Sequence, residues 1–253
     1  MSKLREGKHL TDLTGGFASI EIGNLVHQRE IQEQLMRPRY QEYGEELLAL
    51  KLPAFLFSED EVEGMVGKAR KYRNLILDLR GNHGGRADTL SYLVGGVFEH
   101  DVHIDDRVGR QESKPEIAKP LHKPFTGKLV VLVDSASASA AELFARIIQL
   151  EKRGAVVGDQ TSGRVMEARH FQEQMGADTV VFYGASITEW DLIMDDGKSL
   201  EHTGVTPDEV VLPSARDLAN GADPVLARAA EVLGVKIGPD DAGKAFPYEW
   251  PPE

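Results

Sequence analysis

The chain has 253 residues, a formal net charge of −12 at pH 7 and no cysteine. Phosphate binding needs clustered lysine and arginine, so a chain this acidic is not expected to bind nucleic acid. The lack of cysteine excludes disulfides, thiolate metal sites and a cysteine nucleophile. The densest apolar runs, Leu75–Leu79 and Leu129–Val133, are strand-sized and too short to span a membrane. We expect a globular protein with a sizeable core and no metal or other cofactor.

The first half of the chain predicts helices around one buried strand. A helix or helix pair is expected over Ile31–Leu50, interrupted at Pro38 because a proline inside a helix removes a hydrogen bond and clashes. Glu59–Tyr72 predicts the next helix, since its apolar residues recur on one face. Asn74–Leu79 predicts a buried strand, followed by a glycine-rich turn and a helix over Ala87–Phe98.

The order strand, turn, helix returns in the second half. Lys128–Val133 predicts a buried strand, Ala138–Glu151 a helix and Gly154–Gly158 another strand, which together favour an α/β core with parallel pairing. The polar stretch Asp101–Phe125 is expected to be a long connection or lid. The remaining expected elements are two strands of a hairpin or small sheet, a last helix and a loosely attached tail: Thr179–Tyr183, Ile187–Met194, Asp223–Leu233 and Phe246–Glu253.

The turn Arg80–Gly85 is the first candidate site. A glycine pair after a buried strand lets backbone N–H groups face a ligand, and such donors can hold an oxyanion or a phosphate. The turn lacks the Gly-Lys-Ser/Thr of a phosphate-binding loop. A tight turn that simply needs positive φ is an equally good interpretation of this stretch.

The serine-rich stretch Asp134–Glu142 is the second candidate site. It joins a predicted strand to a predicted helix, and the free N–H groups and dipole of a helix N-terminus favour developing negative charge. The alanines around Ser139 leave room for a substrate backbone. The alternative is that Ser135, Ser137 and Ser139 only cap the helix, because serine is a preferred capping residue.

Four segments between about residues 70 and 212 carry these features in a fixed order: Leu75–Gly85, Val130–Ala145, Ala155–Gly163 and Glu201–Asp208. Together they resemble the motifs of the carboxy-terminal processing (tail-specific) serine peptidases. The resemblance implies an α/β fold similar to the crotonase and Clp-protease cores, built from repeated ββα units. It also implies a hydrolase that cleaves peptide bonds in a polypeptide substrate.

The resemblance assigns roles to individual residues. It places the nucleophile on Ser139, three residues before Glu142. The oxyanion hole would be formed by the N–H of Ala140 and one N–H from the Gly84-Gly85 turn. We expect Asp78 and Arg80 to pin the strand end without a catalytic role.

The chain departs from the family where the general base is expected. The family's lysine, in a Gly-Lys pair, is replaced by Arg164, which stays protonated and cannot accept the serine proton. One branch of the family, similar to tricorn protease, lacks this lysine and uses a Ser–His–Glu arrangement. In that branch the base would be His27 or lie in a segment not present, with Glu201 as the orienting carboxylate.

Three other interpretations stay open. The base could be His83, which lies next to the glycine pair, or Lys198, in the closing region. Alternatively, the protein has lost its activity and only binds peptides. Arg164 would pair with a substrate carboxylate or, by preference, form a structural ion pair.

The expected organisation has three parts. Residues 1–14 resemble the last strand of a preceding PDZ-like module, residues 15–215 form the peptidase core, and residues 216–253 form a C-terminal helix and a proline-rich tail. Family members are often periplasmic or secreted, but this chain shows no signal peptide, so its compartment stays open. A homo-oligomer is one of the expected assemblies.

Overall fold

The computed structural model describes residues 36–110, 113–176 and 181–247 of the chain. The chain divides into two units, Met1–Arg37 and Pro38–Glu253, and every element below belongs to the second unit. Among the described residues, no helix combines the length and apolar character needed to cross a membrane.

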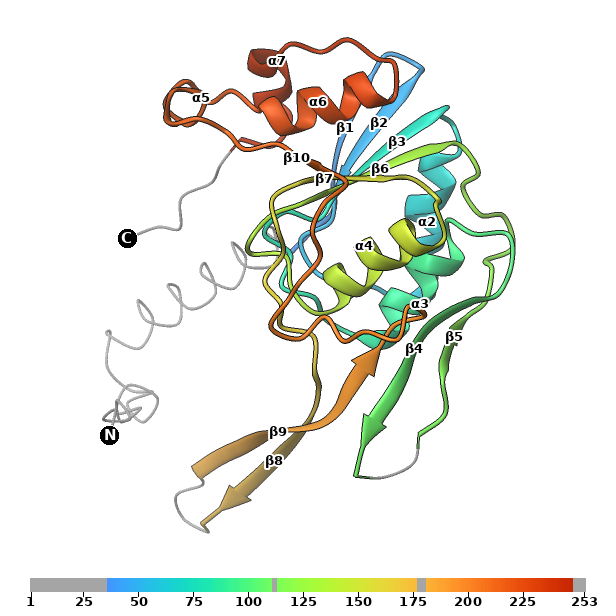
Figure 1. The fold of residues 1–253 in the computed structure, drawn as a ribbon, viewed down its shortest axis with the longest axis vertical. Coiled ribbons are helices and arrows are strands. Elements are labelled where there is room, and N and C mark those ends of the chain that lie inside the picture. The colour runs from blue at the N-terminus through green and yellow to red at the C-terminus, as the bar shows by residue number, and fades with distance from the viewer. Residues whose placement is uncertain (1–35, 111–112, 177–180, 248–253) are drawn as a thin grey trace, which may run out of the picture. The chain divides into compact units, whose positions relative to one another are not determined.

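A six-stranded sheet forms the centre of this unit (Figure 1), in the order β1-β2-β3-β6-β7-β10. Its strands are β1 Arg39–Tyr43, β2 Leu47–Lys51, β3 Asn74–Asp78, β6 Lys128–Val133, β7 Ala155–Gly158 and β10 Glu209–Val210. Only the edge strand β1 pairs antiparallel, and the other neighbours are parallel. Parallel strands place their carboxyl ends at one edge of the sheet, where ligands of open α/β folds usually bind.

Helices cover both faces of this sheet. One face packs against α2 Glu59–Ala69, α3 Ala87–Gly95 and α4 Ala140–Leu150, and the other against α6 Pro224–Val232 and α7 Pro239–Gly243. Successive strand residues alternate between the two cores: Leu75 and Leu77 join the first core, and Ile76 joins the second. Strands buried on both faces read as unbroken apolar runs, which is why β3 and β6 are recognisable in the sequence.

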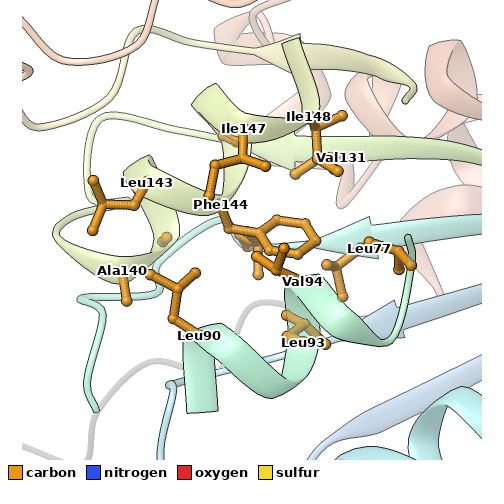
Figure 2. Packing of buried hydrophobic residues seen from close by; sticks show 14 of the residues in the cluster. Leu77, Leu90, Leu93, Val94, Val131, Ala140, Leu143, Phe144, Ile147 and Ile148 are labelled. Carbon is orange, nitrogen blue, oxygen red and sulfur yellow. The ribbon is translucent and has the colours of Figure 1, made fainter. Parts of the chain in front are cut away.

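The first core holds α4, the helix that follows the serine-rich turn. Phe144 is fully buried and lies among residues of α3 and the sheet, including Val94 and Leu77 (Figure 2). Ala140, at the first turn of α4, belongs to the same cluster. The N-terminus of the helix is therefore fixed by packing, which also fixes the turn before it.

A second, four-stranded sheet has the order β5-β4-β9-β8. Its strands are β4 Val102–Gly109, β5 Glu116–Ala118, β8 Glu167–Met175 and β9 Val181–Ile193, all paired antiparallel. The β8–β9 hairpin projects away from the helices and the central sheet (Figure 1).

Seven of the elements expected from sequence are confirmed within a few residues: α2, β3, α3, β6, α4, β7 and α6. The helix expected over Ile31–Leu50 is wrong for its described part, which is the β1–β2 hairpin. Gly44, with φ 59°, makes the turn, and Leu47–Leu50 is buried because both faces of the sheet are covered. The part before residue 36 lies outside the described residues.

Two further expectations are corrected. The polar stretch Asp101–Phe125 is not a connection or lid throughout, because it contains β4 and β5. The two strands expected at Thr179–Tyr183 and Ile187–Met194 are, where described, a single strand, β9, and its partner β8 was not expected. Both errors concern strands with few buried side chains, so their apolar residues do not mark the strand bounds clearly. The short helices α5 Ala215–Asn220 and α7 were also not expected.

Candidate active site

Ser139 lies between β6 and α4 and has an unusual backbone conformation. Its φ is 55° and its ψ −123°, whereas an ordinary N-cap residue is extended. A non-glycine residue in this region costs of order 1–3 kcal/mol and persists only where neighbours enforce it. Ser139 is partly exposed at the N-terminus of α4, so its side chain can meet a ligand.

The other two serines of the turn differ from Ser139. Ser137 is fully buried, and its hydroxyl donates to the Leu79 carbonyl at 2.8 Å and contacts Asp134. Ser135 is exposed in the turn and precedes both. Ser137 is therefore a structural residue that ties this turn to the end of β3.

The Gly84-Gly85 turn lies directly against Ser139. A Cβ on Gly84 would come within 2.6 Å of the Ser139 Cβ and 3.0 Å of the Ala140 nitrogen. Both glycines have positive φ, 90° and 151°. Residue 84 must therefore be glycine for the two turns to approach this closely.

The two glycines of the turn differ in whether their N–H groups are already hydrogen-bonded. The Gly84 N–H donates to the side-chain oxygen of buried Asn82 at 2.8 Å, so this donor is already used. Among the described residues, the N–H groups of Gly85 and Ala140 have no hydrogen-bond acceptor. These two remain free to bind a ligand oxygen.

Glu142 organises the site, although from sequence it was expected only to mark the motif. Its side chain is fully buried, and its carboxylate accepts hydrogen bonds from the N–H groups of Ser139, Gly163 and Arg164, at 3.0, 2.7 and 3.0 Å. It also accepts from the Thr161 hydroxyl at 2.5 Å. One buried carboxylate thus holds residues 161–164 against the nucleophile turn. The spacing Ser139-x-x-Glu142 is that of a capping box, a signal that could have indicated the contact.

Arg164 reaches Ser139 through its backbone. Its carbonyl accepts the Ser139 N–H at 2.9 Å, while its exposed side chain donates from Nε to the Ser162 hydroxyl at 2.8 Å. Within the described part of the chain, the guanidinium has no carboxylate partner. The ion pair preferred from sequence is thus not present.

Glu201 holds the segment that follows Arg164. Its Oε2 accepts from the Val165 N–H at 2.7 Å and the Met166 N–H at 3.3 Å, and its Oε1 lies 3.9 Å from Nε2 of His202. These contacts bring Glu201 to the segment that joins Arg164 to β8. They involve none of the three candidate bases.

The three candidate bases differ in how near the structure places them to Ser139. His83 is exposed and directly precedes Gly84, the residue that touches Ser139. Lys198 is exposed in the turn before Glu201, where its backbone pairs with Met194, and no contact joins its side chain to Ser139. His27 lies outside the described residues.

Asp78 and Arg80 hold the carboxyl end of β3, as expected. The Arg80 guanidinium binds Asp78 at 2.8 Å and Asp223, the N-cap residue of α6, at 2.7 Å. Lys51 lies 3.2 Å from Asp78. Burial opposes ionisation of Asp78, but the charges of Arg80 and Lys51 outweigh it and hold its pKa well below the usual range.

Comparison with known proteins identifies the family of this chain. The sequence model of peptidase family S41 matches residues 46–211, which contain Ser139, Glu142, the glycine pair and Glu201. The chain therefore belongs to peptidase family S41, a family of serine-type peptidases that includes the carboxy-terminal processing and tail-specific proteases.

Two curated relatives and one solved structure illustrate the similarity. The tail-specific protease of Haemophilus influenzae is 30% identical over 125 residues, 48% of this chain and 18% of that protein. The carboxyl-terminal-processing protease of a Synechocystis species is 29% identical over 167 residues, 64% of this chain and 38% of that protein. The crystal structure of tricorn protease matches with a TM-score of 0.56 at 18% identity, over 86% of this chain and 20% of that one. The chain thus spans well under half the length of these proteins.

Proposed function

We propose that this protein is a serine-type endopeptidase that cleaves polypeptides through an acyl-enzyme on Ser139. The backbone of Ser139 carries the proposal, because φ 55° and ψ −123° turn the residue out of an ordinary capping conformation beside two free N–H donors. Membership of peptidase family S41 supports the same chemistry.

The proposed reaction has two steps. The Ser139 hydroxyl oxygen attacks the substrate carbonyl carbon as a base removes its proton, and the tetrahedral oxygen accepts hydrogen bonds from the N–H groups of Ala140 and Gly85. The C–N bond then breaks, and the leaving amine takes the proton from the base. Water attacks the acyl-enzyme in the same way and releases the second product.

For the base we propose His83, since it is the candidate whose neighbour in the chain touches Ser139. A histidine can exchange a proton near neutral pH, which Arg164 cannot do. Glu201 would orient the substrate-binding segment through Val165 and Met166 rather than the imidazole.

The proposal extends to the fold. The parallel central strands, each leading through a turn into a covering helix, support assignment of the core to the crotonase and Clp-protease type of repeated ββα units. A homo-oligomer remains part of the proposal, as does the division into residues 1–14, 15–215 and 216–253.

One observation favours a second candidate, a catalytically impaired protein that binds peptides on the same fold. The family's lysine position holds Arg164, and the contacts of Ser139 within the described part of the chain include no base. Such a protein would bind a polypeptide without cleaving it, and Ser139→Ala would leave that binding unchanged.

Degradation of β-casein distinguishes the two functions. We expect the unaltered protein to cleave it and Ser139→Ala to lose the activity, because no other described serine of the turn has both exposure and the strained backbone. Ser135→Ala, at the exposed serine of the same turn, is the matched control and should retain activity. Equal cleavage by the Ser139 and Ser135 variants would reject the proposal.

A further inference from the structure

Strand β8 begins at the candidate active site. The Arg164 carbonyl accepts the Ser139 N–H, the next two N–H groups, of Val165 and Met166, are bound by Glu201, and β8 starts at Glu167. Only two residues therefore separate the residue bonded to Ser139 from the strand. Both are held by a carboxylate, so the start of β8 is fixed relative to the nucleophile.

The outer edge of β8 is unpaired. Within the described part of the chain β8 is the last strand of its sheet, and its one partner is β9. Alternate residues of an edge strand direct their N–H and C=O groups outward, where an extended chain can pair with them. Strand β4 pairs with β9 only over Trp190–Ile193, so the outer part of the hairpin extends beyond that pairing (Figure 1).

One face of the hairpin is mostly apolar, with Arg169 and Glu173 as its charged residues. Arg169 pairs with Ile187, Phe171 with Ala185, Glu173 with Tyr183 and Met175 with Val181, and cross-strand partners share a face. Five large apolar side chains on this face are exposed: Phe171 39%, Met175 68%, Val181 51%, Tyr183 55% and Ile187 52%. The opposite face carries exposed polar residues, including Gln172, Gln174, Ser186 and Thr188.

An exposed apolar face on a two-stranded hairpin marks a surface that binds something. A strand edge pairs with any extended backbone regardless of sequence, and the adjoining apolar face favours apolar side chains. An unfolded or extended polypeptide offers both along its length, whereas a folded protein offers them only where it exposes an edge strand beside an apolar patch.

We propose that the edge of β8 and the apolar face of the β8–β9 hairpin bind the substrate polypeptide in extended form and lead it to Ser139. The inference rests on the proposed peptidase function, and it names the substrate as unfolded polypeptide with apolar side chains. The continuity of β8 with the residues bonded to Ser139 favours this occupant over a second copy of the chain. A substrate must reach Ser139, whereas contact between two copies does not require it.

Binding of an unfolded protein to the full chain tests the inference without requiring turnover. The probe is fluorescently labelled, reduced and carboxymethylated α-lactalbumin, and its Kd is measured by anisotropy with Ser139→Ala. Adding Phe171→Thr, Tyr183→Thr and Ile187→Thr should weaken binding by about tenfold or more, because threonine keeps the strand but removes apolar contact. The matched control adds Gln172→Thr and Gln174→Thr on the opposite face and should bind as before.

A second variant covers the case in which the threonine variant does not fold. Residues 172–184 are replaced by Asn-Gly, a two-residue turn that joins the paired residues Phe171 and Ala185 and keeps the base of the hairpin. It should also bind about tenfold more weakly or worse, since most of the apolar face is gone.

Three results would overturn the inference: no binding by Ser139→Ala alone, equal binding by the shortened hairpin, or a change from dimer to monomer in light scattering with Kd unchanged. The last would identify the face as an interface between copies. Failure of the proposed peptidase function can be told apart from failure of this inference. It would appear as absent fluorophosphonate labelling in the protein that retains Ser139.

Discussion

Ser139 keeps its strained backbone because its N–H is held twice, by the Arg164 carbonyl and by the Glu142 carboxylate. The same carboxylate fixes Gly163 and Arg164, so strain at the serine is compensated by four hydrogen bonds to one buried group. Burying a carboxylate is costly unless it is fully hydrogen-bonded. The four hydrogen bonds to Glu142 offset that cost.

Gly84→Ala should remove activity. The new Cβ would lie 2.6 Å from the Ser139 Cβ, and either the serine or the glycine turn must move. We expect β-casein cleavage to fall by about 10²-fold or more, because small displacements of catalytic groups have effects of that size. Gly81→Ala is the control: Gly81 also has positive φ, 72°, but nothing lies within 4 Å of its added Cβ. Similar losses in both variants would mean that backbone strain, not the contact with Ser139, is responsible.

His83→Gln tests the proposed base. Loss of a general base reduces turnover by roughly 10²–10⁴-fold, and we expect kcat to fall in this range with little change in KM. His122→Gln, at an exposed histidine outside the motifs, should be unaffected. A kcat unchanged by His83→Gln would remove His83 from the mechanism and leave Lys198 or His27 as candidates.

The motif predicted that Ser139, Ala140 and the glycine turn lie together, and the structure places Gly84 against both residues. Their catalytic roles stay predictions. It could not indicate that the Gly84 N–H is already bonded, because that depends on the burial of Asn82 beneath the turn. The contacts of Glu201 with Val165 and Met166 could not be predicted from the sequence either, because they join residues 36 and 35 positions apart.

At the scale of elements, the strands and helices of the central layer were predictable because each has a strong apolar pattern. β1 and β2 were not, since a run such as Leu47–Leu50 suits a buried helix as well as a strand and only pairing with β3 decides between them. The strands of the second sheet are harder still to predict from the sequence. They are largely exposed, and β4 is recognisable only from its pairing with β5 and β9.

Strand β4 also carries a buried carboxyl group with an unusual pKa. Burial raises the pKa of Asp105 to about 6; Arg107 opposes the rise, and Glu116 and Glu167 add to it. His103, on the same strand, also opposes the rise. Because the folded pKa exceeds the unfolded value, Asp105 binds its proton more tightly in the folded state, and stability falls as pH rises from about 4 to about 6.

The variant Asp105→Asn should therefore remove part of the pH dependence of stability. We expect the free energy of unfolding of the unaltered protein, relative to this variant, to be lower at pH 7 than at pH 4 by about 2 kcal/mol. Urea unfolding at the two pH values measures this difference. Asp106→Asn, at the exposed neighbour, is the control. A difference that grows with pH instead would show that Arg107 dominates and that the carboxylate is stabilising.

At the scale of the whole molecule, one ion-pair network connects the C-terminal helices to the candidate site. Arg80 joins Asp78 at the end of β3 to Asp223 at the start of α6, and the turn that follows Arg80 contains Gly84. The carboxyl end of β3 is thereby tied to the start of α6, in one of the two layers that cover the sheet. Sequence predicted the fixed strand end but not its partner, because Asp223 lies 143 residues away.

The family match covers only part of this chain and a smaller part of its relatives. The chain matches peptidase family S41 over residues 46–211 and spans well under half of the relatives compared with it. The shared part contains Ser139 and the N–H groups of Ala140 and Gly85, which we propose as the nucleophile and the oxyanion donors. The role proposed for the β8–β9 hairpin in substrate binding rests on the structure of this chain, because relatives at 29–30% identity give no guide to it.

Labelling with a fluorophosphonate probe followed by peptide mapping tests whether Ser139 is a competent nucleophile. We expect one adduct per chain, located on Ser139, present in Ser135→Ala and absent in Ser139→Ala. An adduct on another residue, or no adduct in the unaltered protein, would contradict this expectation.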